Sequence, residues 1–60
     1  MTLKEARLSN GWSLEEAAEL YGLDIETVIN CETNIKKSYD WAINIILGVL
    51  ELEYKDIVLN

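Results

Sequence analysis

The chain has 60 residues, half of them apolar, with eleven acidic and five basic side chains and a net charge of −6. A chain of this length forms one domain at most and lies near the lower limit for burying a stable core. The acidic balance disfavours nonspecific attraction to nucleic acid or to an anionic membrane, and it favours solubility or a basic protein partner.

Several classes of site are disfavoured by what the composition lacks. Cys31 is the single cysteine, so no internal disulfide can form, and without histidine no metal site is expected. The longest apolar run, 42–50, is interrupted by Asn44 and is too short to span a bilayer. No carboxylate pair is accompanied by a nucleophile or by metal-ligand spacing, so we expect neither an enzyme nor a cofactor. Because no cationic and then apolar leader begins at Met1, the expected location is the cytoplasm.

A first helix is predicted near the N-terminus. Thr2 belongs to the residue types that cap helix N-termini, because its side chain accepts a hydrogen bond from an otherwise unpaired amide. Asn10-Gly11 ends the helix, since both residues tolerate the left-handed conformation that terminates helices. The residues spaced to share one face are Leu3, Ala6 and Arg7.

Two further helices follow, separated by a tight turn. Ser13 and Glu16 form a capping box at the start of the second helix, which runs to about Tyr21 before Gly22 closes it. Asp24 is suited to cap a third helix that covers 25–33. The residues expected to face inward are Ala17, Ala18, either Leu20 or Tyr21, Val28 and Cys31. Two short helices joined by a glycine-containing turn are typical of a helix-turn-helix, here at about 13–33.

The remaining residues predict two more helices. Asn34 is expected to adopt the left-handed conformation that ends a helix, and a loop is expected at 35–37. Ser38 is expected to cap a fourth helix over 39–50, and a last short helix at about 53–58 docks two side chains. The apolar stripe of the fourth helix is Ala42, Ile43, Ile46, Leu47 and Leu50, and the docked side chains are Tyr54 and Ile57. The prediction is a compact all-α domain of five helices over residues 1–60.

Five segments, in order, resemble the Cro/cI-type (XRE) helix-turn-helix regulators of phages and bacteria. Residues 3–7 (LKEAR) look like the opening helix of that family, and 11–19 (GWSLEEAAE) resembles its G-L-S-Q-E-E-L-A-E stretch. Residues 22–24 (GLD) lie where the family has G-V-S, and 27–34 (TVINCETN) is similar to T-I-S-x-W-E-x-G. The segment 52–57 (LEYKDI) looks like V-S-L-D-D-I. The resemblance implies a lambda repressor-like fold and a small transcriptional regulator that binds double-stranded operator DNA through its third helix.

The resemblance also implies roles for individual residues. In this family an arginine of the first helix pairs with a glutamate at the end of the third, which here are Arg7 and Glu32. Glu26 and Asn30 could read base edges in the major groove, although Asn30 is also consistent with an ordinary exposed polar side chain. The segment 36–37 could hold phosphates or could be a solvated loop. The residues expected to contact DNA are Ser13, Glu26, Thr27, Asn30, Asn34, Lys36 and Lys37.

Other features of the same region argue for a protein partner. From residue 9 to residue 35 the chain has no lysine or arginine, and its acids are Glu15, Glu16, Glu19, Asp24, Glu26 and Glu32. Leu14 stands where the family often has a DNA-contacting glutamine. An apolar patch on the DNA face would suggest a partner, although scattered exposed apolar side chains are common. The candidate patch is Leu14, Ile25, Ile29 and Trp41, whereas Trp12 is expected in the core.

Two functions therefore remain open. The first is an operator-binding regulator that acts as a dimer. The second is a helix-turn-helix that has lost DNA binding and acts through protein contacts, as an antirepressor or a modulator of a regulator. A homodimer through the last two helices is a hypothesis based on Val49, Leu52, Val58 and Leu59.

Overall fold

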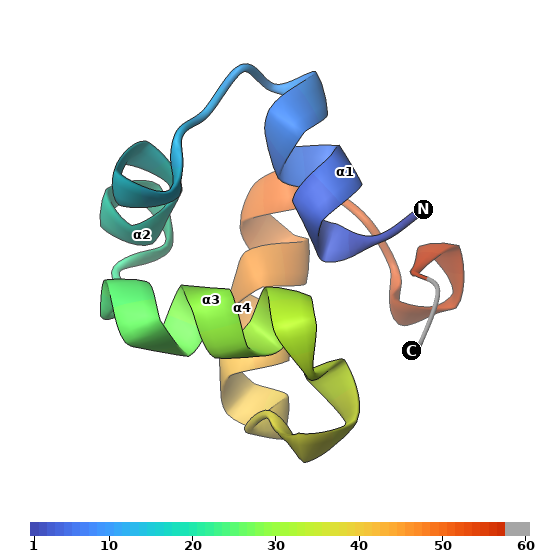
Figure 1. Cartoon of the computed structure of the whole chain (residues 1–60). Helices are drawn as coiled ribbons and strands as arrows, with labels where there is room; N and C mark the ends of the chain where they lie inside the picture. Colours follow the sequence, from blue (N-terminus) through green and yellow to red (C-terminus); the bar gives the residue numbers. More distant parts are fainter. Residues whose placement is uncertain (58–60) are drawn as a thin grey trace.

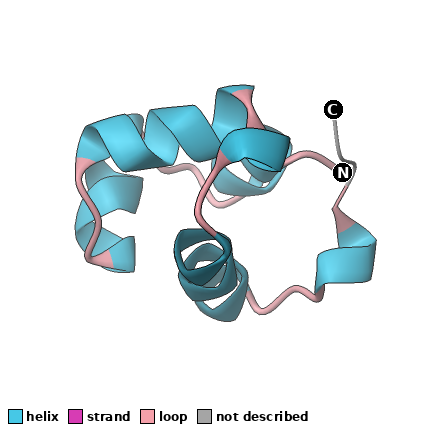
Figure 2. Ribbon diagram, turned by 90° about the horizontal axis from the view of Figure 1, so that it is seen from below, coloured by secondary structure: helices cyan, strands magenta, loops and turns pink. Residues whose placement is uncertain are grey.

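Four α-helices and two short 3-10 turns make up residues 1–57, the part of the chain that the computed structural model describes (Figure 1). The elements are α1 (Leu3–Ser9), α2 (Leu14–Tyr21), α3 (Ile25–Thr33), η1 (Ile35–Lys37), α4 (Asp40–Leu50) and η2 (Tyr54–Asp56). Within these residues there is no strand (Figure 2), so the predicted all-α class is confirmed. In Figure 1, α3 crosses in front of α4, while α1 and α2 lie above it on opposite sides.

The first two helices begin with the local signals that the sequence contains. The Thr2 hydroxyl accepts a 3.1 Å hydrogen bond from the Glu5 amide, and the Glu5 carboxylate accepts one of 2.7 Å from the Thr2 amide. Ser13 and Glu16 repeat this reciprocal arrangement at 3.1 and 3.0 Å, which confirms the predicted capping box. Each box satisfies two amides that a helix N-terminus otherwise leaves without a partner.

The core forms where the helices meet, and it decides between the two residues of α2 that were predicted as alternatives. Tyr21 is 5 % exposed and Leu20 is 52 % exposed, so Tyr21 is the inward residue of α2. Trp12 packs against the core as expected, with its ring edge-on to Tyr21 at a centroid distance of 6.3 Å. The fully buried side chains of largest volume are Val28, Cys31, Ile43 and Ile46. Burying such apolar side chains is the main contribution that stabilises so short a chain.

The connection between α3 and α4 differs from the prediction. Asn34 has φ −147° and is not left-handed, and Ile35 is buried in the core at 6 % exposure, within the 3-10 turn η1. Ser38 does not cap α4: Tyr39 occupies the N-cap position, and the Ser38 hydroxyl lies 3.1 and 2.9 Å from the carbonyl oxygens of Asn30 and Asn34. The Ser38 hydroxyl gives carbonyl groups at the end of α3 a hydrogen-bond partner, so the helix ends there without a residue in the left-handed conformation.

The predicted fifth helix is also corrected. In the described part of this segment the backbone forms only the 3-10 turn η2, in which the Asp56 carboxylate accepts a 2.9 Å hydrogen bond from the Glu53 amide. This local bond stabilises a tight turn in place of an α-helix. Ile57 is buried as predicted, but Tyr54 is 48 % exposed and does not dock. Val58, which the prediction included, lies outside the described residues.

Candidate functional site

Helices α2 and α3 are joined by a turn that brings them close together. Gly22 adopts the left-handed conformation with φ +71°, and the Leu23 amide donates to the Ala18 carbonyl at 3.0 Å. Ala17 and Ala18 are buried between the helices, and their small side chains permit this close approach. Asp24 occupies the N-cap position of α3, although its side chain makes no capping hydrogen bond. One face of α3 is thereby buried and the other is turned to solvent.

The outward face of α3 is open to solvent and contains both polar and apolar side chains. Glu26, Asn30 and Thr33 are exposed, and Ile25 and Ile29 are 38 % and 40 % exposed. Thr27, a predicted contact residue, is only partly accessible. The face therefore alternates apolar and polar groups and contains no cation.

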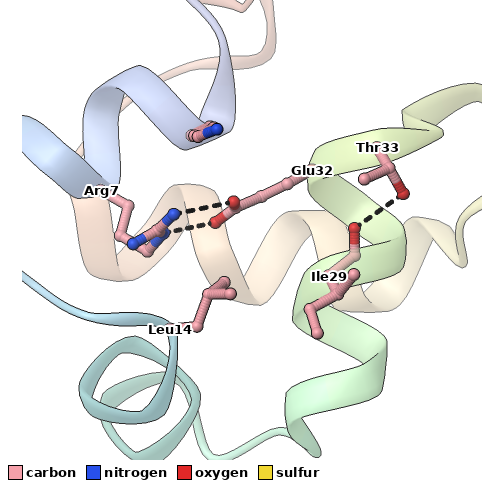
Figure 3. A pocket seen from close by; sticks show the side chains of 6 residues that line it. Arg7, Leu14, Ile29, Glu32 and Thr33 are labelled. Atoms are coloured by element: carbon pink, nitrogen blue, oxygen red, sulfur yellow. Dashed lines mark hydrogen bonds and ion pairs between the residues drawn. The ribbon is translucent and has the colours of Figure 1, made fainter.

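A buried ion pair holds the C-terminal end of α3 against α1 (Figure 3). The Arg7 guanidinium donates from Nε to Glu32 Oε2 at 2.7 Å and from Nη2 to Oε1 at 3.2 Å. Its Nη1 donates to the Trp12 carbonyl at 2.9 Å, and the two charged side chains are only 6 % and 7 % exposed. Such a two-pronged pair fixes orientation as well as distance. Arg7 is consequently occupied and cannot reach a phosphate.

A second set of hydrogen bonds connects α3 to the segment that contains the lysine pair. The Asn30 amide group donates to the Ser38 hydroxyl at 3.3 Å, and the same hydroxyl lies 3.1 Å from the Asn30 carbonyl oxygen. Lys36 and Lys37 lie between these partners in sequence, and both are exposed. The two exposed cations therefore follow the C-terminal end of α3 directly, in η1.

The charges around this face are mostly negative. Glu15 and Glu19 of α2 are exposed, as are Asp24 and Glu26 at the start of α3, and Glu16 is exposed at the start of α2. The 3.0 Å hydrogen bond that the Glu16 carboxylate accepts from the Ser13 amide is the main cause that lowers its pKa, and it favours the ionised carboxylate. Within residues 1–57 the ion pairs are Arg7–Glu32 and Lys55–Glu53, so the cations left for a ligand near α3 are Lys4, Lys36 and Lys37.

A hollow of about 200 Å³ lies between α1, α2 and α3, on the side of the Arg7–Glu32 pair (Figure 3). Leu14 from α2 and Ile29 from α3 line it. The structure thus brings together two members of the predicted apolar patch. Trp41 instead stacks on Tyr39, with a centroid distance of 5.7 Å and an interplanar angle of 15°. Lys4 and Thr33, which were not predicted as site residues, complete the rim.

The remaining predicted contact residues are partly committed to local bonds. The Ser13 oxygen accepts the Glu16 amide but keeps its own proton to donate, while the Asn34 backbone binds within the connection to α4. Lys4 could have been predicted from the sequence as a neighbour of Arg7, because it precedes Arg7 by three residues and side chains at this spacing share a helix face. Nothing in the sequence pattern pointed to Thr33. Its hydroxyl donates to the Ile29 carbonyl at 2.9 Å.

The buried titratable groups behind this face are held in their neutral forms. Burial, reinforced by the nearby Glu32 carboxylate, raises the pKa of Tyr21 to about 12. Burial also raises the pKa of the Cys31 thiol. Among residues 1–57 there is no cluster of His, Cys, Asp or Glu suited to a metal ion, and no helix there has the length and apolar character needed to cross a membrane.

Comparison with known proteins adds no relative to this description. No family model, curated protein or solved structure matches the chain.

Proposed function

We propose that this chain is a small helix-turn-helix transcriptional regulator of the Cro/cI type, which binds operator DNA by placing α3 in the major groove. The observation that supports this proposal best is the way α3 is mounted. Its outward face is exposed, the Arg7–Glu32 pair holds one side, and the Ser38–Asn30 hydrogen bonds hold the lysine segment at its end. A rigid helix with a cationic segment at its end is the arrangement that major-groove readers use.

The chemistry of each exposed side chain indicates which part of the DNA it would contact. Asn30 gives one amide proton to Ser38 and keeps its other proton and its oxygen, which match the donor and acceptor edge of adenine. Glu26 can accept from the amino group of cytosine, and Ile25 can contact a thymine methyl group. Lys36 and Lys37 bind phosphates next to the C-terminal end of α3 and set the register.

The acidic surroundings make this a weak binder per protomer. With two or three cations in contact, the slope of log affinity against log salt is expected to be about −2 to −3 for each protomer. Occupation of two half-sites by linked protomers would double the slope and raise the affinity.

The test is a fluorescence anisotropy titration with DNA from the gene's own upstream region, at about 0.05 and 0.15 M salt. The double variant Lys36→Ala/Lys37→Ala is expected to weaken binding and to reduce the salt slope by about one for each lysine. Lys55→Ala is the matched control, because Lys55 lies in η2 and is already paired with Glu53. Equal losses in the control and the double variant, or no sequence-dependent binding at the lower salt, would refute the proposal.

A second function, binding of a protein regulator, is favoured by the hollow that Leu14 and Ile29 line. In a DNA reader this position normally presents polar groups, whereas here an apolar surface with an acidic surround would suit an apolar side chain of a basic partner. This binding would tolerate salt better than DNA binding does, so absence of DNA binding would direct mutagenesis to Leu14 and Ile29.

A further inference from the structure

A hollow of about 270 Å³ lies along α2, separate from the one that Leu14 and Ile29 line. Its walls are an aromatic ring, an aliphatic side chain and two carboxylates, which belong to Trp12, Leu20, Glu16 and Glu19. Within α2, Glu16 stands three residues before Glu19 and four before Leu20, so these three side chains share a helix face. The hollow therefore combines apolar and negatively charged walls, and its lining includes none of the residues proposed to contact DNA.

The aromatic wall of this hollow is fixed from behind. The Trp12 ring lies edge-on to the buried ring of Tyr21, at a centroid distance of 6.3 Å. The Trp12 carbonyl accepts a 2.9 Å hydrogen bond from Arg7 Nη1, and its amide donates to the Arg7 carbonyl at 3.3 Å. Trp12 is nevertheless only partly buried, so it remains accessible from the hollow. An indole attracts cations more strongly than the other aromatic side chains do.

The two carboxylates of the hollow have no cation to balance them among residues 1–57. The ion pairs within this range are Arg7–Glu32 and Lys55–Glu53. The Ser13 amide donates to Oε1 of Glu16, which lowers the pKa of Glu16 and leaves Oε2 of the ionised group for a partner. Because like charges at this spacing repel one another, a cation between Glu16 and Glu19 would relieve an unfavourable interaction.

We propose that this hollow binds an arginine side chain from a basic segment of another protein. The guanidinium packs against the Trp12 indole and pairs with Glu16 and Glu19, while its aliphatic stem lies along Leu20. Leu20 is 52 % exposed, so it offers an apolar contact for the methylene groups of such a stem. Arginine suits these walls better than lysine does, because its planar group stacks on aromatic rings and its five N–H donors can serve two carboxylates.

Charge complementarity favours a basic protein segment as the occupant. The chain carries −6, and residues 9–35, which include the whole hollow, contain no lysine or arginine. Such a surface attracts a basic peptide and repels a nucleic acid or a second acidic copy. The inference does not depend on DNA binding, and it also differs from the apolar contact considered at Leu14 and Ile29.

The affinity of one such hollow is expected to be low. Cation–π contacts and ion pairs at accessible sites each contribute little, so we expect dissociation constants of about 0.1–1 mM for a short peptide. Salt screens these charges, so binding should weaken as the salt concentration rises.

A fluorescence titration of the whole chain without DNA tests this inference. Trp41→Phe leaves Trp12 as the single tryptophan, and the probe is a short capped peptide of alternating arginine and glycine. We expect a saturable change in Trp12 fluorescence with this peptide and weaker binding of the lysine counterpart. The counterpart with citrulline, which keeps the shape but is neutral, should not bind. No saturable change up to about 10 mM, or equal affinity for the three peptides, would overturn the inference.

Single substitutions on α2 show whether the peptide occupies this hollow. Glu16→Gln and Glu19→Gln should each raise the dissociation constant about three- to fivefold, and glutamine at position 16 preserves the capping box. Glu15→Gln is the matched control, because it removes the same charge from an exposed position of α2 that does not line the hollow. This control should leave the constant unchanged, and an equal loss in Glu15→Gln would show that only net charge attracts the peptide.

Two further outcomes would assign the hollow to a different occupant and so overturn the inference. Binding of arginine amide as tightly as the peptide would indicate a site for a small cation. A change in Trp12 fluorescence with chain concentration alone, lost in Glu19→Gln, would indicate a second copy of the chain.

Discussion

The buried pair between Arg7 and Glu32 makes the sharpest stability prediction. Glu32→Ala leaves the guanidinium, whose side chain is 6 % exposed, without its carboxylate and with only the Trp12 carbonyl as an acceptor. Breaking a buried pair by removing one partner costs about 3–5 kcal/mol, because an uncompensated charge stays buried. A chain of this length has roughly 3–9 kcal/mol of total stability. The variant should therefore lose at least about a third of its stability.

Thermal and urea unfolding followed by circular dichroism would measure this loss. A cost of about 3 kcal/mol lowers the midpoint of a domain this small by roughly 12–24 °C. The matched control is Glu53→Ala, which breaks the exposed Lys55–Glu53 pair, 79 % and 71 % exposed, and should cost at most about 0.5 kcal/mol.

The double variant Arg7→Met/Glu32→Leu separates the cost of a stranded charge from the value of the pair. Replacing both partners with apolar groups strands no charge, so this variant should be considerably more stable than Glu32→Ala. If Glu32→Ala and Glu53→Ala differed by less than about 1 kcal/mol, the reasoning from burial would be wrong.

Three further predictions follow from the backbone and the titrating groups. Glu51→Gly should stabilise the chain by about 1 kcal/mol in urea unfolding, because Glu51 has φ +58° at the end of α4, where glycine is unstrained; a loss of stability would contradict this. Ser13→Ala should cost about 1 kcal/mol at neutral pH. It should also raise the pKa of Glu16 only part of the way toward 4.5 in an NMR titration, because the amide of residue 13, the main cause of the lowered pKa, remains. Since the folded pKa is lowered, that carboxylate stabilises the fold above its ordinary pKa and stops doing so as pH falls through the folded value, so the gap to the parent chain should narrow in acid. Cys31, whose burial raises its pKa, should react with a thiol reagent only after unfolding, and rapid labelling of the native chain would place it at the surface.

Local chemistry explains which parts of the fold were predictable. The capping boxes of α1 and α2 each involve residues three apart, and Gly22 alone supplies the left-handed end of α2. Such signals act within one turn of the chain, so the sequence is enough to place them. The bounds of α2 and α3 accordingly agree with the prediction.

The candidate site was predictable in part. Its exposed α3 residues follow from helical spacing, whereas the lysine pair and the Arg7–Glu32 pair were implied by the family resemblance. The Leu14–Ile29 hollow could not be derived, because its depth depends on how three helices pack. Trp41 was grouped with that patch on sequence grounds, but a neighbouring ring, Tyr39, holds it elsewhere.

The sequence by itself determined the helical class, the starts of the first two helices, the turn before α3 and most of the buried residues, because short-range hydrogen bonds and apolar periodicity act locally. Only the tertiary structure decided how α3 ends, since Ser38 reaches back eight residues to Asn30. It alone decided that the pair at Arg7 and Glu32, 25 residues apart, is buried. It also decided that α4 leaves Trp41, Ile45 and Val49 exposed. These outcomes depend on which groups the packed helices bring together, and the energy of such contacts exists only after the chain has folded.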